Sequence, residues 1–189
     1  MHGVGTSTRL VGLAGSLRKA SYSRATLLAL REHLPGAVKL EICDLRLPLY
    51  NEDEDGAASP HDVRLFRDTI GASDGVVIAT PEYNHGIPGV LKNALDWASR
   101  PFGKSVLIDK PVLVISVSPA FTGGVRAQAQ VNETLLSIPA RIVAGPQVVI
   151  GGVAAKIKDG MLDQAFLGFT LQALERLVAI SRPTSRAVQ

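Results

Sequence analysis

Residues 75–97 of the chain read GVVIATPEYNHGIPGVLKNALDW, and this stretch decides the fold. Its first part, Gly75–Thr80, is an apolar, β-branched run in which apolar and polar residues do not alternate. A strand with this pattern is buried on both faces, as in a parallel sheet that helices cover. A loop with two prolines and two glycines follows, and an amphipathic run begins at Pro88. The stretch therefore predicts one strand–loop–helix unit of an α/β protein.

The same unit recurs along the chain. Short apolar runs predict five strands, at residues 9–14, 39–43, 75–80, 112–116 and 147–150. Longer amphipathic runs predict helices near residues 22–33, 60–70, 88–99, 124–137 and 161–180. Such a series implies a doubly wound, five-stranded parallel sheet with helices on both faces.

Two helix boundaries carry local signals. Ser59 and Pro60 predict the start of the second helix, with Ser59 as the cap and Pro60 at the first helical position. Leu34-Pro35-Gly36 predicts the end of the first helix, because proline disfavours a helical residue before it and glycine permits positive φ.

Length and hydropathy set the expected organisation. The 189 residues fit one domain. We expect this domain at residues 9–181, between a flexible N-terminus at 1–8 and a C-terminal tail at 182–189. No apolar run approaches the ~20 residues that span a bilayer, and residues 1–8 lack the apolar core of a signal peptide. We therefore expect a cytoplasmic protein with no membrane partner.

Charge and cysteine content exclude several classes of site. The formal net charge is +3, and the basic residues are scattered, so we expect no nucleic-acid partner, which would need clustered positive charge. The acidic cluster at residues 52–55 predicts a solvated loop. Cys43 is the only cysteine, which excludes an intrachain disulfide and a cysteine-based metal cluster. We expect it to be a buried, inert thiol.

Three loops are candidates for the functional site. Ligands of doubly wound sheets bind outside the carboxyl ends of the strands, near the point where the strand order reverses. The loops after the first, third and fourth predicted strands end at that edge, and all three have unusual sequences.

The first of these loops runs from Gly15 to Arg24, GSLRKASYSR, and leads into a helix. Free backbone N–H groups at a helix N-terminus, serine hydroxyls and an arginine favour a bound phosphate. The loop lacks the Gly-Lys-Ser/Thr ending of a Walker A motif and the spacing of G-x-G-x-x-G, so a phosphate monoester fits better than a pyrophosphate. The alternative is a simple capped turn, with Ser21 or Ser23 as the N-cap and Arg18 in solvent.

The loop after the third strand, residues 80–89, carries a carboxylate, a phenol, an amide and an imidazole on a stiff backbone. Such a loop suits the flat, apolar isoalloxazine ring with its polar edge. The alternatives are that Tyr83 covers the edge of the core, that Asn84 stabilises a turn and that His85 is solvated. We expect no metal site, because no ligand set surrounds His85. We expect Trp97 to pack on the buried face of its helix.

These motifs together resemble the NADPH-dependent FMN reductase family, which includes quinone, azo-dye and chromate reductases. The resemblance rests on Gly15-Ser16-Leu17-Arg18, on Pro81-Glu82-Tyr83-Asn84 and on residues 88–97, PGVLKNALDW. Residues 47–53, LPLYNED, also look like the family's loop after the second strand. The likeness extends from about Arg9 to Val149 and implies a flavodoxin-like fold that binds FMN.

The resemblance also implies site residues. In the family the first loop wraps the FMN phosphate, which by position implies Ser16, Arg18, Ser21, Tyr22 and Ser23. The family commonly has Asn where Ser23 stands, and serine has a shorter reach. The Pro-Glu-Tyr-Asn segment borders the flavin ring, which implies Pro81, Glu82, Tyr83 and Asn84. His85 stands where relatives vary and is expected to tune acceptor preference.

The loop after the fourth strand, residues 116–126, looks like the family's loop on the far side of the ring. Ser118 is the best match for a flavin contact, and Gly123 and Gly124 would let the backbone approach a ligand closely. Relatives often have glycine where Ala120 stands, which leaves the path of this loop open. The alternative is a flexible connection before a helix that starts at Gly124.

The resemblance implies an oxidoreductase that works by ping-pong hydride transfer. NADPH or NADH would reduce FMN, and a small-molecule acceptor would take the electrons: a quinone, free flavin, azo compound or metal oxyanion such as chromate. We expect no catalytic proton-transfer residue, and we expect Glu82, Tyr83 and Asn84 to position the ring. Family members are usually homodimers or homotetramers, and the helices after Pro88 and Gly124 could supply the interface.

Two other functions are compatible with such a topology. A flavodoxin-like electron carrier would bind FMN without oxidising a nucleotide, but such carriers tend to be strongly acidic and this chain is mildly basic. A receiver-type signalling domain would need an acidic pair after the first strand and an aspartate after the third. Those positions hold Gly15-Ser16 and Thr80-Pro81, so we set this function aside.

Overall fold

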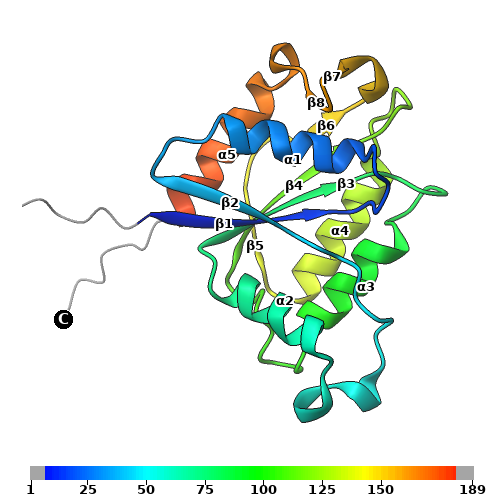
Figure 1. Cartoon of the computed structure of the whole chain (residues 1–189), viewed down its shortest axis with the longest axis vertical. Coiled ribbons are helices and arrows are strands. Elements are labelled where there is room, and N and C mark those ends of the chain that lie inside the picture. Colours follow the sequence, from blue (N-terminus) through cyan, green and yellow to red (C-terminus); the bar gives the residue numbers. More distant parts are fainter. Residues whose placement is uncertain (1–6, 182–189) are drawn as a thin grey trace, which may run out of the picture.

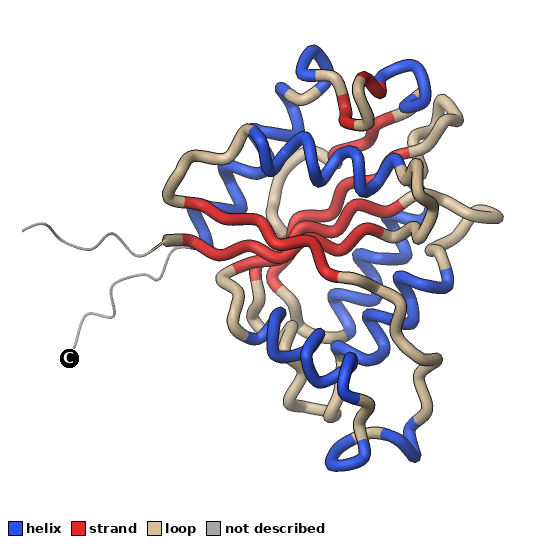
Figure 2. Tube along the Cα trace, in the orientation of Figure 1, coloured by secondary structure: helices blue, strands red, loops and turns tan. Residues whose placement is uncertain are grey.

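The chain folds around a twisted parallel sheet. A computed structural model describes residues 7–181, and its main sheet has the strand order β2-β1-β3-β4-β5, with all pairs parallel (Figures 1 and 2). The strands are β1 (Thr8–Ala14), β2 (Val38–Cys43), β3 (Gly75–Thr80), β4 (Pro111–Val117), β5 (Arg141–Ile142) and β6 (Val148–Ile150). The order reverses at β1, which lies between β2 and β3, so the loop after β1 is at the switch point of the sheet.

Helices cover both faces of the sheet (Figure 1). Helices α1 (Tyr22–Glu32) and α5 (Gly168–Ser181) lie on one face, and α2 (His61–Gly71), α3 (Gly89–Ala98) and α4 (Val125–Ser137) lie on the other. Short 3₁₀ helices lie in the connections: η1 (Glu52–Glu54), η2 (Gly56–Ala58), η3 (Val153–Lys156) and η4 (Gln164–Phe166).

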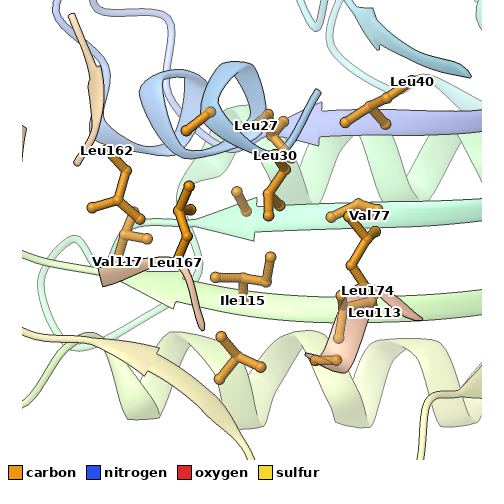
Figure 3. Close-up of a cluster of buried hydrophobic side chains, with 14 of the residues drawn as sticks. Leu27, Leu30, Leu40, Val77, Leu113, Ile115, Val117, Leu162, Leu167 and Leu174 are labelled. Carbon is orange, nitrogen blue, oxygen red and sulfur yellow. The ribbon is translucent and has the colours of Figure 1, made fainter. Parts of the chain in front are cut away.

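Two hydrophobic cores result, one on each face. On β3, Val77 and Ala79 face the core under α1 and α5, whereas Val76 and Ile78 face the core above α2, α3 and α4. Figure 3 shows the first core, in which Leu27 and Leu30 of α1 meet side chains of the sheet. Because successive residues of a strand point to opposite faces, burial on both sides requires the continuous apolar run.

The predicted strands are confirmed, and β3 agrees with its prediction to the residue. The fifth position of the sheet differs from the prediction, because two short strands share it. β5 pairs with Pro111 and Val112 of β4, and β6 pairs with residues 115–117 of the same strand.

The predicted helix at residues 161–180 is wrong in its first part, because α5 begins only at Gly168. The preceding residues form a small antiparallel hairpin, β7 (Ile157–Lys158) and β8 (Met161–Leu162), and then η4. Asp159 and Gly160 both have positive φ at the hairpin turn, which no helix permits. Leu162 and Leu167 are buried and belong to the core under α1 and α5, so apolar residues of this non-helical segment extended the apolar run from which the helix was predicted.

The predicted cap at Ser59 is also wrong. α2 starts at His61 with Pro60 as its N-cap residue, and no side chain caps it. The Ser59 hydroxyl instead accepts a hydrogen bond from Nη1 of Arg67, at 3.2 Å. Arg67 also pairs with Asp55 at 2.7 Å, so the acidic cluster is not wholly solvated. Burial acts to raise the pKa of Asp55, but the hydrogen bond and charge of Arg67 outweigh it and lower that pKa.

Of the segments that we predicted to be flexible, residues 1–6 and 182–189 lie outside the described residues. The predicted N-terminal segment of residues 1–8 is wrong at its end, because Thr8 is a buried residue of β1. Within residues 7–181, no helix has the length and apolar character that a membrane crossing requires.

The interruption between β5 and β6 is filled by a buried side chain. Gln128 of α4 donates from Nε2 to the carbonyl oxygens of Val114, at 3.0 Å, and Val148, at 3.4 Å. Val114 lies between the two stretches of β4 that pair with β5 and β6, and Val148 is the first residue of β6. The amide of Gln128 therefore ties α4 to both strands where the fifth position changes from β5 to β6.

We expect Gln128→Leu to lower the free energy of unfolding by about 1–3 kcal/mol, because it leaves buried carbonyl oxygens without a donor. Urea unfolding followed by circular dichroism measures this change. Gln172→Leu on the exposed face of α5 is the matched control, with an expected effect within about 0.5 kcal/mol. Equal stability of the two variants would contradict the role of Gln128.

Candidate functional site

Three loops meet at the carboxyl edge of the sheet, on the right of Figure 1. They are residues 15–21 after β1, residues 81–88 after β3 and residues 118–124 after β4. Hydrogen bonds join the loop after β3 to the loop after β1 and to the first turn of α4. The edge therefore brings together the residues that the sequence singled out.

The first loop ends in the N-terminus of α1. Ser21 is the N-cap, and its hydroxyl accepts a hydrogen bond from the N–H of Arg24 at 3.2 Å. The N–H groups of Tyr22 and Ser23 precede the first intrahelical bond and remain free for a ligand. The first turn holds no acidic residue, and the buried Ser23 hydroxyl has no hydrogen-bond partner in the structure. The capped turn and the anion site, which were alternatives in the sequence, are therefore compatible.

Basic side chains lie beside the first loop. A cleft of about 380 Å³ lies between the first loop and the end of β2, and Arg18, Lys19, Arg24 and Arg46 line it. Its one carboxylate, that of Asp44, pairs with Arg46 at 2.8 Å. The guanidinium of Arg18 is exposed and lies 5.6 Å from the centre of the Tyr22 ring. This charge and the free N–H groups fit a phosphate monoester.

The loop after β3 contains a tight two-residue turn. The N–H of Tyr83 bonds to the carbonyl of Gly86, and the reverse bond is also made, at 3.1 and 3.0 Å. Asn84 and His85 occupy the centre of the turn with φ values of 50° and 62°. The Tyr83 hydroxyl lies 3.0 Å from Oγ of Ser16, so this loop is hydrogen-bonded to the first loop, which follows β1. Asn84 thus lies at the centre of a turn that the backbone hydrogen bonds of Tyr83 and Gly86 close.

Glu82 of the same loop caps α4. The N-cap position of α4 is Gly124, which has φ 88° and no side chain to cap with. Oε2 of Glu82 accepts hydrogen bonds from the N–H groups of Arg126, at 3.0 Å, and Ala127, at 3.3 Å. A carboxylate suits this place because the helix dipole is positive there. The side chain that we expected to position a ring therefore joins the loop after β3 to the first turn of α4.

The loop after β4 packs closely on the end of β6. Gly123 has φ 68°, and a Cβ there would lie 2.2 Å from Cγ1 of Val149. Ser118 is buried, and its hydroxyl accepts a hydrogen bond from the N–H of Ala120 at 3.1 Å. The loop is therefore a constrained segment, with Phe121 at its surface and 92% exposed. This structure argues against the flexible connection that was the alternative for it.

Apolar side chains are exposed around the same edge. Leu17, Tyr83, Phe121 and Val125 each come from one of the three loops or the first turn of α4, and all are exposed. Pro81 is buried beneath them. Exposed apolar groups beside a polar loop fit a flat ring system that would cover them.

Sequence reasoning missed the polar side chains that hold the connection after β2 and the loop after β3 in place. Asn93 of α3 accepts from the N–H of Tyr50 at 2.8 Å and donates to the carbonyl of Pro48 at 2.9 Å. Trp97, buried as predicted, donates to the same carbonyl. Gln130 accepts from the N–H of Ile87 at 2.8 Å. The sequence did contain one signal for such a side chain, because Asn93 places an amide on the buried face of a predicted helix.

Cys43 is half-buried beside the first loop. Burial, and secondarily the charge of Glu41, raises its pKa to about 11. The thiol therefore remains protonated at neutral pH, in agreement with the inert role that we predicted.

Comparisons with known proteins match the chain to a family model and to several relatives. The family model described as NADPH-dependent FMN reductase matches residues 8–155. A quinone reductase of Pseudomonas putida is 43% identical over 148 residues, which cover 78% of this chain and 80% of that protein. An NAD(P)H-dependent FMN reductase of Pseudomonas aeruginosa is 38% identical over 172 residues, which cover 89% and 92%.

A solved structure is similar over nearly the whole chain. It is FerB, a flavoenzyme NAD(P)H:(acceptor) oxidoreductase from Paracoccus denitrificans, with a TM-score of 0.79 and 32% sequence identity. The match covers 92% of this chain and 95% of FerB.

We expect Glu82→Ala to lower the free energy of unfolding by about 1–2 kcal/mol, the usual cost of losing an N-terminal cap. Thermal and urea unfolding measure the change. Glu133→Ala, an exposed position on the same helix, removes an equal charge without a cap. If both variants are equally stable, Glu82 does not join the loops as described.

Proposed function

Because this chain belongs to the NADPH-dependent FMN reductase family, and is an NAD(P)H-dependent oxidoreductase that uses FMN, we propose that residues 9–181 form one domain that holds FMN at the carboxyl edge of its sheet. The observation that carries this placement is the N-terminus of α1. It combines free N–H groups, a buried Ser23 hydroxyl without a partner and no acidic residue in the first turn. When bound, FMN supplies hydride transfer from NAD(P)H to an acceptor.

The first loop is the proposed phosphate site. The N–H groups of Tyr22 and Ser23 and the Ser23 hydroxyl donate to phosphate oxygens, and Arg18 adds its charge. Ser21 acts through its cap, which fixes the turn. Ser16 can accept from the Tyr83 hydroxyl and still donate its own proton to the phosphate, because a hydroxyl both accepts and donates.

The other two loops are the proposed ring site. Pro81, Tyr83 and Asn84 border the ring from the β3 side, and Ser118 and Gly123 border it from the β4 side. Glu82 maintains the spacing of these loops through the cap on α4. No proton-transfer residue is required, because the flavin carries the redox chemistry.

The proposed electron acceptor is a quinone. Relatives at 43% identity are named quinone reductases. A hollow of about 540 Å³ beside the first loop is lined largely by apolar side chains, including Leu17, Leu45, Leu49 and Val90. A flat apolar acceptor suits such a wall better than a metal oxyanion does. Azo compounds, free flavin and chromate are the other candidate acceptors.

The proposed assembly is a homodimer formed through α4. Val125, Ala129 and Leu136 form one exposed stripe of this helix, and Leu136 is 66% exposed. Positions four and seven apart lie on one helical face, so a second copy could bury the stripe. A tetramer of two such dimers is the larger alternative. A cytoplasmic location stays a prediction, which fractionation of cells with an antibody to the chain tests.

The acceptor is tested with FMN-loaded protein under anaerobic conditions. We expect NADPH to bleach the visible flavin absorbance, and 1,4-benzoquinone to restore it faster than chromate or an azo dye at equal concentration. Slow reoxidation by the quinone would contradict the proposed acceptor. Bound FMN that neither NADPH nor NADH reduces would instead indicate an electron carrier.

The interface is tested by Leu136→Glu, which places a charge in the proposed contact. We expect the mass measured by light scattering to fall from two chains to one, because a buried unpaired carboxylate is costly. Leu65→Glu, at an exposed leucine of α2, should leave the assembly unchanged. A Leu136→Glu variant that remains a dimer would exclude this face.

A further inference from the structure

Two basic side chains meet on the rim of the proposed flavin site. Arg126 is the second residue of α4, and His85 lies in the tight turn after β3. Nη1 of Arg126 is hydrogen-bonded to Nδ1 of His85. Arg126 is exposed and so is the imidazole, with 75% of its side chain accessible. The pair thus joins the loop after β3 to the first turn of α4, next to the loops proposed to hold the ring.

The charge of Arg126 has no carboxylate partner in the part of the chain that the structure describes. Glu82 lies in the same loop as His85, and its Oε2 is already held by two backbone N–H groups of α4. Its Oε1 lies 3.7 Å from Nδ1 of His85. No carboxylate oxygen of residues 7–181 lies within 4.0 Å of the Arg126 guanidinium. The fork of Arg126 therefore keeps donors for an external anion.

His85 can add a donor to the same anion. Arginine can only donate, so Nδ1 of His85 accepts its hydrogen bond, and the imidazole proton then resides on Nε2. The backbone of His85 is also costly, since left-handed φ disfavours a side chain by about 1–2 kcal/mol. Residues kept in such conformations cluster at functional sites. A glycine would relieve the strain but would remove the donor.

We propose that Arg126 and His85 bind the 2′-phosphate of NADPH and thereby give this enzyme its preference for NADPH over NADH. The inference rests on the proposed function, because the pair borders the loops assigned to the flavin ring. A phosphate monoester carries close to two negative charges at neutral pH and offers three oxygens to the guanidinium fork. An arginine near the ribose is a recurrent solution for a 2′-phosphate in nucleotide-binding sites. NADH has a hydroxyl at that position and gains little from the pair.

The test measures nucleotide binding and flavin reduction separately in the FMN-loaded protein. In anaerobic stopped-flow reduction, Arg126→Gln should raise the half-saturating NADPH concentration roughly 10- to 100-fold, the loss expected for a hydrogen-bonded charge. The half-saturating NADH concentration should change by less than about twofold. Arg31→Gln, at an exposed arginine near the C-terminus of α1, removes the same charge. This control should alter the half-saturating concentration of neither nucleotide.

Binding without turnover gives a second readout. Calorimetric titration with adenosine 2′,5′-bisphosphate should show the same loss in Arg126→Gln, and titration with adenosine 5′-monophosphate should not. His85→Asn should weaken the bisphosphate by a smaller factor, because asparagine tolerates positive φ and keeps the turn. The Arg126 contribution should also diminish as salt increases.

Three results would overturn the proposal. In the first, Arg126→Gln binds both nucleotides as the parent does. In the second, it loses NADPH and NADH equally, which would place Arg126 at a group that the two share. In the third, the variant slows only the reoxidation of the flavin by an anionic acceptor, which would indicate that the pair binds the acceptor. A protein that binds no FMN would instead contradict the proposed function.

Discussion

Burial of β3 and β4 on both faces is the constraint on which the rest of this structure depends. Their side chains fill two cores, and helices cover both, so the body of the sheet offers no room for polar chemistry. Parallel strands also end at one edge, which places the loops after β1, β3 and β4 together. The site is therefore built from loops, and its precision depends on how those loops are held.

The loops are held by side chains from neighbouring elements. Glu82 caps a helix that starts at a glycine, and the Ser16–Tyr83 contact joins the loops after β1 and β3. Gln130 fixes the backbone at Ile87 from α4. These bonds make α4 and the loop after β3 one unit, so the edge is shaped before any ligand arrives. Preorganisation of this kind reduces the ordering cost of binding a cofactor.

The sequence predicted the layers of the fold better than it predicted the contacts of the site. Continuous apolar runs such as Gly75–Thr80 specify a doubly buried strand by composition alone. Residues 161–167 misled because Leu162 and Leu167 are buried in the core as residues of a helix would be, although Asp159 and Gly160 form a hairpin turn before them. The role of Glu82 could not be predicted, since its partners are 44 and 45 residues away in the chain. Local patterns carry no information about which helix a loop carboxylate will meet.

The central claim is that the N-terminus of α1 holds the phosphate of FMN at the carboxyl edge of the sheet. A crystal structure of the protein with FMN bound tests it most directly. The account predicts phosphate oxygens within hydrogen-bond distance of the N–H groups of Tyr22 and Ser23 and of the Ser23 hydroxyl. A phosphate that leaves the Ser23 hydroxyl without a partner and binds elsewhere, for example against Arg46 alone, would contradict it.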